Sequence, residues 1–182
     1  MQRYSLPAIV LHWLIALLII GAFVLGLVMT GIPGLTPTKL RYVAWHKWIG
    51  VTVLGLAVLR ALWRLGNRPP PLPAATPLWQ RQSARLMHVL LYVLIVAVPV
   101  SGYAFTLAAG VPVVYFGVLH LPVFFGPDPV LKPILREVHY WLDMSLAALV
   151  VLHVAGALKH QFIDRDGLLA RMSPFAPNKE KA

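Results

Sequence analysis

The sequence predicts an all-α membrane protein, a four-transmembrane-helix bundle with a short interfacial segment between the third and fourth helices. Of the 182 residues, 59% are hydrophobic and only 12% are charged, and the mean hydropathy is +0.74. The apolar residues gather in four runs, each long enough to cross a hydrocarbon layer of about 30 Å at about 1.5 Å per residue. A chain of this length leaves no room for a soluble appendage, so we expect residues 1–182 to form a single domain.

The four runs are separated by segments rich in turn-forming residues. We expect the spans at residues 8–29, 42–65, 84–108 and 134–162. The first connection, TGIPGLTPTK, is short, and the second, NRPPPLPAATP, is proline-rich and therefore extended. The third, residues 110–133, is too apolar for a free loop and has too many prolines for a fifth span. It predicts a segment lying at the membrane interface, with one short helix as an option.

Two features of the chain exclude other classes of protein. The chain has no cysteine, which excludes disulfides, thiolate-bound iron–sulfur clusters and covalent c-type haem attachment. The first apolar run has no small-residue cleavage site behind a short apolar core, so we expect it to stay as a membrane helix.

The formal net charge of +10 fits membrane lipid as the partner, and we expect no nucleic-acid binding. The basic residues lie at the ends of the spans, where they contact anionic headgroups and set the topology. Eleven basic residues fall on one side of the predicted bundle and five on the other, which places both termini in the cytoplasm. The eleven are Arg3, Arg60, Arg64, Arg68, Arg81, Arg85, Lys159, Arg165, Arg171, Lys179 and Lys181, and the five are Lys39, Arg41, Lys47, Lys132 and Arg136.

Histidines recur inside these apolar spans. His139 and His153 are fourteen residues apart in the fourth span, which on a helix is a rotation offset of about 40° and a rise of about 21 Å. They therefore share one face near opposite sides of the bilayer. The alternating topology puts His12 at the inner level with His153, and His46 at the outer level with His139. Ionisable groups at membrane depth are costly and indicate function with a nearby partner.

Two opposed histidines in a helical bundle can hold a haem iron through both axial positions. Small residues near these histidines fit a macrocycle, which needs bare helix surface; they are Gly21, Gly26, Gly50, Ala147 and Ala148. One alternative is that the histidines only form hydrogen bonds between helices. Another is a metal transporter, but such proteins use carboxylates at membrane depth, and here only Asp143 qualifies.

The remaining histidines leave alternatives open. His88 begins the third span at the inner level and competes with His12 as the ligand opposite His153. His160 lies two turns beyond His153, where it would bond a haem propionate or a quinone carbonyl, or simply sit at the interface. His120 falls in the third connection and is interpreted as incidental.

Basic side chains near the two levels are candidate partners for propionates. Arg60 follows His46 by fourteen residues, which puts it on the same face at the inner level, where it would bind a propionate or extend to the inner headgroups. Arg41, Lys47 and Arg136 flank the proposed outer haem and are candidates for the same role there.

Four stretches, taken together, resemble the bacterial cytochrome b561 family, which is related to the cytochrome b subunits of nickel hydrogenases and formate dehydrogenases. They are RYSLPAIVLHWL, AWHKWIGVTVLGLAVLRALWRL, HVLLYVLIVAVPVSG with YFGVLHLP, and VHYWLDMSLAALVVLHVAGALKHQFIDRDGLLARM. The resemblance covers nearly the whole chain. It implies a multi-pass protein of the bacterial inner membrane that holds two b haems.

The resemblance also implies a ligand set and a function. It assigns the axial positions to His12, His46, His139 and His153 and disfavours His88. Family members pass electrons between the membrane and a quinone, and one branch is implicated in oxidising superoxide at the outer face and reducing ubiquinone. The compact length of this chain is similar to that branch.

Two functions from different classes follow. The first is a quinone-linked oxidoreductase that takes electrons from an outer-face donor, with superoxide as the candidate. The second is a membrane anchor and electron relay for a larger dehydrogenase or hydrogenase, which requires a redox partner protein. Short tails favour the first. A haem-free transporter would be recognised by the lack of a reducible b-type absorption band.

Overall fold

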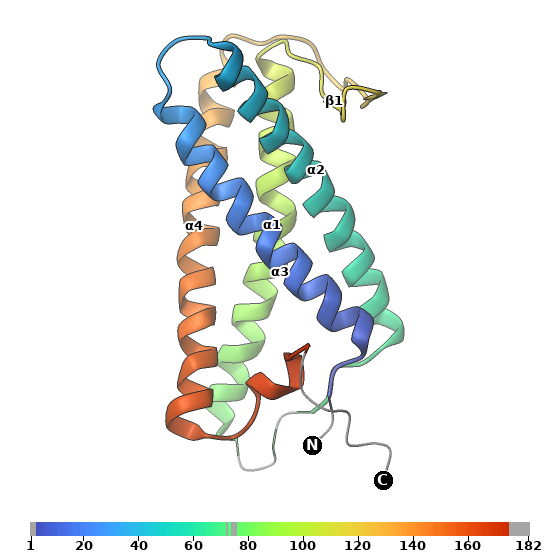
Figure 1. Ribbon diagram of the computed structural model, residues 1–182, viewed down its shortest axis with the longest axis vertical. Coiled ribbons are helices and arrows are strands. Elements are labelled where there is room, and N and C mark those ends of the chain that lie inside the picture. The colour runs from blue at the N-terminus through green and yellow to red at the C-terminus, as the bar shows by residue number, and fades with distance from the viewer. Residues whose placement is uncertain (1–2, 72, 74–75, 175–182) are drawn as a thin grey trace.

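In the computed structural model, which describes residues 3–71, 73 and 76–174, four long helices run alternately up and down as a bundle (Figure 1). They are α1 (Leu6–Gly31), α2 (Pro37–Gly66), α3 (Leu78–Ala108) and α4 (Leu131–Lys159). A π-helix, His160–Asp164, continues α4, and a 3-10 helix follows at Leu169–Met172. All four long helices are long and apolar enough to cross a membrane, which confirms the predicted fold class.

The two ends of the bundle differ, and each is named here by its contents. At the terminal end, α1 and α3 begin and α2 and α4 end (Figure 1). At the opposite, hairpin end lie two short antiparallel strands, β1 (Val114–Tyr115) and β2 (Leu119–His120). The predicted inner level corresponds to the terminal end, and the predicted outer level to the hairpin end.

Each helix begins two to six residues before the predicted span. Proline stands in the first turn of α1 and α2, where its missing N–H costs nothing. The hydroxyl of Thr36 accepts a hydrogen bond from the Lys39 amide of α2 at 3.2 Å, and Asp128 accepts the Leu131 amide at 2.9 Å. These starts are polar, so a search for apolar runs places them too late.

The option of a short helix within residues 110–133 is wrong, because that segment forms the hairpin. Phe116 and Gly117 have φ of 50° and 73°, which turns the chain back between the strands. The hairpin is fastened to α2: the Trp48 indole donates to the Val114 carbonyl at 2.8 Å, and Thr52 bonds the Tyr115 hydroxyl at 2.8 Å. Prolines remove the amide donors that a helix would need.

Few side chains are buried inside the bundle, and many large apolar side chains point outward. Leu17 is 66% exposed, Val93 57% and Val151 67%, all in the middle of spans. An apolar outer surface of this extent is unstable in water and matches a hydrocarbon solvent. The protein therefore contacts lipid around its circumference.

Close helix packing follows the chain order, with α1 on α2, α2 against α3 and α3 along α4. Within the described residues, α4 makes few close backbone approaches to α1 or α2. The side of α4 that faces these two helices is therefore free to carry bulky side chains or a bound group.

The chain after α4 folds back over the terminal end. The Tyr4 amide donates to the Arg171 carbonyl at 3.3 Å, the Trp13 indole to the Met172 carbonyl at 2.8 Å, and the Arg171 guanidinium to the Pro71 carbonyl at 2.7 Å. Arg171 is only 7% exposed. We call this set of contacts the clasp, because it joins three parts of the chain that are distant in sequence.

Candidate metal centres

The structure brings the histidines of the spans together in two pairs at different depths. His12 of α1 faces His153 of α4 with ring centroids 6.2 Å apart and an interplanar angle of 77°. His46 of α2 faces His139 of α4 at 6.1 Å and 84°. Both pairs join helices whose backbones do not pack closely. These are the two pairs that the alternating topology predicts.

The spacing of each pair suits a shared metal ion. Two imidazoles that bind one metal from opposite sides, each through a bond of about 2 Å, have ring centroids about 6.2 Å apart. A direct hydrogen bond or stacked contact between the two rings would bring them closer. The donor type also fits, since imidazole is the usual axial ligand of b-type haem iron.

At the hairpin end, both rings are oriented by hydrogen bonds to main-chain carbonyls. His46 Nδ1 lies 3.0 Å from the Ala22 carbonyl of α1. His139 Nδ1 lies 3.0 Å from the Val98 carbonyl of α3 and 3.1 Å from the Ser101 hydroxyl. Engaging Nδ1 in this way leaves Nε2 of each ring for a metal and fixes the ring plane.

Two glycines make room for these rings. A Cβ atom at Gly102 would lie 2.8 Å from Cε1 of His139, which no side chain can tolerate without a shift of the ring. A Cβ atom at Gly26 would lie 3.4 Å from Cε1 of His46. Of the small residues expected to border a macrocycle, Gly26 is thus in place against a ring, and Gly50 lines the adjacent cavity.

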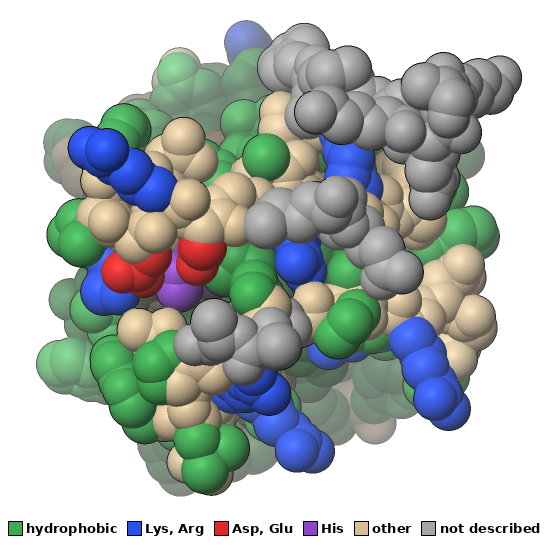
Figure 2. Space-filling model, turned by 90° about the horizontal axis from the view of Figure 1, so that it is seen from below, with side chains coloured by type: hydrophobic (Ala, Val, Ile, Leu, Met, Phe, Trp, Pro, Cys, Tyr) green, Lys and Arg blue, Asp and Glu red, His purple; other side chains and the backbone are tan. Residues whose placement is uncertain are grey.

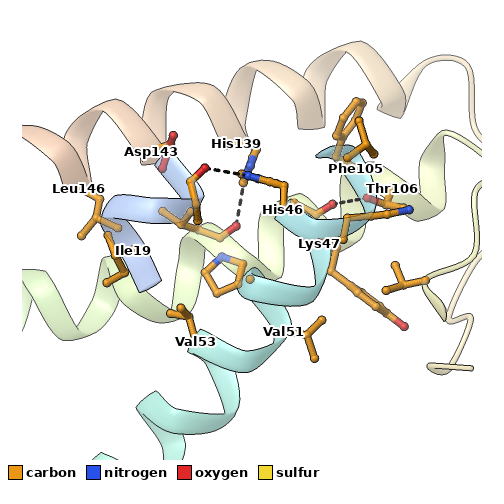
Figure 3. Close-up of a pocket in the computed structure, with 18 of the residues that line it drawn as sticks. Ile19, His46, Lys47, Val51, Val53, Phe105, Thr106, His139, Asp143 and Leu146 are labelled. Carbon is orange, nitrogen blue, oxygen red and sulfur yellow. Dashed lines mark hydrogen bonds between the residues drawn. The ribbon is translucent and has the colours of Figure 1, made fainter. Parts of the chain in front are cut away.

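The cavity around the hairpin-end pair is lined mainly by apolar side chains of the four helices (Figure 3). Its polar lining includes Lys47 and Asp143, and the Asp143 carboxylate interacts electrostatically with His46. An apolar cavity with few polar groups is typical of a site for a large planar cofactor.

At the terminal end, a third ring joins the pair. His88 of α3 lies 5.5 Å from His153, centroid to centroid, at 73°. This separation is shorter than the 6.2 Å between His12 and His153 and shorter than two rings need on opposite sides of one metal. The structure therefore favours His12 as the partner of His153, and it keeps His88 close by.

Arg60 reaches into the terminal end of the bundle. Its guanidinium donates to the Ala8 carbonyl at 2.8 Å and to the Tyr92 hydroxyl at 3.0 Å, and it interacts electrostatically with His12 and His153. The side chain thus points between α1 and α3. It brings a positive charge close to this pair of histidines.

The other predicted partners lie farther out. Arg41 and Arg136 are exposed at the hairpin end, and Arg136 pairs with Glu137 at 3.2 Å. Lys47, which stands next to His46, lines the cavity, whereas Arg41 and Arg136 do not. His120 is exposed in β2, and His160 lies at the terminal end beside two carboxylates, described below.

Sequence reasoning missed the residues of α3 that support His139. Val98, Ser101 and Gly102 flank Pro99, the proline inside α3. The signal was present in the stretch PVSG, since small residues next to a helix-interior proline are unusual unless something packs there. The partner of that surface was not predictable, because it lies on α4.

Fold and site together define a helical membrane protein with two histidine pairs inside the bundle, and the comparisons show similarity to membrane cytochromes. Residues 3–175 match the family described as Prokaryotic cytochrome b561. The chain is 36% identical to Cytochrome b561 homolog 2 of Escherichia coli (strain K12), over 94% of this chain and 91% of that protein. It is 29% identical to Cytochrome b561 homolog 1 of the same strain, over 96% and 98%. It is also 29% identical to Probable superoxide oxidase CybB of Yersinia pestis, over 95% and 97%.

The chain therefore belongs to the prokaryotic cytochrome b561 family. It is a bacterial multi-pass membrane cytochrome with a role in electron transfer, and membership of the family implies that it binds haem b.

Proposed function

We propose that the protein is a di-haem b cytochrome that transfers electrons between an outer-face donor, with superoxide as the candidate, and the quinone pool, with ubiquinone as the candidate acceptor. The observation that carries the proposal is the presence of two histidine pairs, at 6.2 Å and 6.1 Å, at different depths of one bundle. His12 and His153 would hold one haem, and His46 and His139 the other. When bound, each haem supplies reversible one-electron chemistry at its iron.

The protein's own groups would direct this chemistry. His12 with His153, and His46 with His139, would hold the irons through imidazole nitrogens, and iron held in this way would favour outer-sphere electron transfer over oxygenation. Arg60 provides a positive charge near the terminal-end pair, suited to a propionate. At the hairpin end, Arg41 and Arg136 are proposed for the same role.

We place the hairpin end at the outer face of the bacterial inner membrane and both chain termini in the cytoplasm. The larger group of basic residues, eleven in number, supports a cytoplasmic terminal end. All of them but Lys179 and Lys181 lie within the described residues. Lys39, Arg41, Lys47, Lys132 and Arg136 at the hairpin end would attract a small anion such as superoxide and raise its encounter rate, with salt sensitivity. The resemblance to the Yersinia pestis protein over 95% of the chain supports this donor.

The quinone is proposed to bind at the terminal end, near His160. This residue follows His153 by seven positions, two turns of helix, and its side chain is 23% exposed. His160 Nδ1 is engaged by Asp166 at 2.7 Å, which leaves Nε2 as the ring atom for a quinone carbonyl.

The test is a haem count and redox titration of the purified protein, repeated on His46→Ala and His153→Ala. We expect two b haems per chain and the loss of mainly one in each variant. Superoxide should reduce the wild-type haems, and added ubiquinone should reoxidise them. A wild-type count of one, or a variant that keeps both haems, would refute the paired arrangement. Co-purification of a large redox subunit would favour the anchor function instead.

A further inference from the structure

We propose that His160, Asp164 and Asp166 form a binding site for a divalent transition-metal ion at the terminal end, separate from the histidine pairs in the bundle. Each residue offers one ligand atom, and these atoms all lie within 4.8 Å of one another. His160 Nδ1 is 2.7 Å from Asp166 Oδ2 and 3.1 Å from Asp164 Oδ2. Two carboxylates thus converge on a single nitrogen atom.

The local backbone produces this convergence. The π-helix places Asp164 four residues after His160 on the same side. Arg165 then adopts a left-handed conformation, with φ of 51° and ψ of 35°, which turns the chain and returns Asp166 to the ring. The Asp166 amide donates to the His160 carbonyl at 3.4 Å. The three ligands are therefore held by main-chain structure as well as by their own contacts.

The location of the two carboxylates is unusual for so basic a protein. The chain has sixteen basic and six acidic residues. At the terminal end, within the described residues, both acidic side chains converge on one histidine, while basic side chains are spread over that face (Figure 2). These carboxylates are not distributed as partners for the arginines. They form one concentrated negative site.

The ligand set selects the class of ion. Mg²⁺ and Ca²⁺ prefer oxygen ligands alone, whereas Zn²⁺ and its neighbours accept imidazole together with carboxylates. Bonds of about 2.0–2.2 Å from Zn²⁺ to nitrogen and oxygen place ligand atoms about 3.4 Å apart. The observed separations between His160 Nδ1 and the carboxylate oxygens are 2.7 Å and 3.1 Å. The ligand atoms would therefore have to move only slightly apart to bind such an ion. Three protein ligands leave a position for water, because the side chains are 23–27% exposed.

Lys159 is the competitor for this site. Its ammonium lies 2.5 Å from Asp164 Oδ2, the same oxygen that faces His160. The lysine side chain is 41% exposed, so it can swing into solvent when a metal takes that oxygen. While no metal is bound, the Lys159 ammonium stabilises the Asp164 carboxylate. Removing the charge of Lys159 should therefore strengthen metal binding.

Metal binding would also affect the neighbouring quinone site, and this consequence rests on the proposed function. A metal on Nδ1 fixes the His160 ring and places a positive charge beside it. Exchange of electrons with quinone should then slow when the site is occupied.

The experiment is equilibrium dialysis of the haem-loaded protein against Zn²⁺, with bound zinc measured per chain. Haem would occupy His12, His46, His139 and His153, so these four histidines would not contribute to zinc binding. We expect one saturable ion per chain in the wild type. Asp164→Asn and Asp166→Asn should each weaken binding about tenfold or more, and Lys159→Gln should tighten it.

Glu137→Gln is the matched control, since it makes the same chemical change in an exposed carboxylate at the other end. It should bind zinc like the wild type, and an unchanged haem spectrum in every variant shows that the fold is intact. Wild-type affinity in the Asp164→Asn/Asp166→Asn double variant, or no saturable binding in the wild type, would overturn the proposal. Zinc that binds without slowing quinone exchange would leave the metal site standing and count against a quinone near His160.

Discussion

The two histidine pairs have nearly the same geometry but very different surroundings. At the hairpin end, the rings of His46 and His139 bond to main-chain carbonyls, and Gly26 and Gly102 pack against them. At the terminal end, neither His12 nor His153 has a hydrogen bond to its ring from any residue that the structure describes. That pair instead has a third imidazole nearby and the charge of Arg60.

This difference predicts a direction for electron flow. A histidine whose Nδ1–H donates to a carbonyl is a more basic ligand, which stabilises ferric iron and lowers the potential. The carboxylate of Asp143 next to His46 would act in the same sense, whereas Arg60 would favour the reduced state of a haem held at the terminal end. We therefore expect the lower potential at the hairpin end, so that electrons move downhill toward the terminal end.

The largest effect should come from removing a proposed haem ligand at the terminal end, where a third histidine lies close to the pair. His12→Ala should lose the terminal-end haem, and His88→Ala should keep both haems, because the spacing of His88 from His153 is too short for a shared metal. Haem content per chain is the measurement. If His88→Ala loses a haem and His12→Ala does not, the terminal-end pairing is His88 with His153.

The next largest effect should come from Gly102→Ala. The added Cβ atom would lie 2.8 Å from His139 Cε1, so the ring must move away from its position, and haem at the hairpin end should bind weakly or be lost. Gly55→Ala is the control, because Gly55 is exposed on α2 and its Cβ atom would meet nothing within 4 Å. Normal haem content and spectra in Gly102→Ala would show that the ring is not confined there.

Arg60→Gln should lower the potential of the terminal-end haem. Loss of one nearby charge is expected to shift it by roughly 50 mV, equivalent to about 1.2 kcal/mol for one electron. A potentiometric titration should show a lower reduction potential for one haem and an unchanged potential for the other. Arg68→Gln serves as the control, since Arg68 is exposed beyond the end of α2, and an equal shift in both variants would exclude a local effect of Arg60.

Asp143→Asn should have a smaller and opposite effect, at the other haem. Removing the carboxylate beside His46 should raise the hairpin-end potential by about 30 mV, and Asp143→Glu should restore most of it. The expected difference in reduction potential between the two haems is therefore smaller in either the Arg60 or the Asp143 variant. A titration in which Asp143→Asn moves the terminal-end component would contradict the assignment.

Much of this architecture was predictable from sequence because lipid imposes simple rules. Four apolar runs, alternating topology and a fourteen-residue spacing were enough to place His139 and His153 on one face of α4 and to predict their partners. The support of His139 was not predictable, because it depends on which face of α3 meets α4 at Ser101 and Gly102. The hairpin was also missed, since its left-handed turn at Phe116 has no signal in hydropathy.

The same kind of limit applies to charged residues. Arg60 was placed at the correct level by its spacing from His46, but its contacts with Ala8 and Tyr92 come from two other helices. Spacing along one helix predicts depth and face. It does not predict which neighbouring groups a long side chain will reach.

The clasp at the terminal end implies an order of assembly. Tyr4, Pro71 and Arg171 meet only after residues 169–172 have been synthesised, which is long after α1, α2 and α3 have entered the bilayer. Until then, the Trp13 indole, next to His12, lacks the Met172 carbonyl to which it donates in the finished fold. We therefore expect a porphyrin to reach the terminal end more readily before residues 169–172 have folded back, and a chain ending ahead of Leu169 would lack all three contacts.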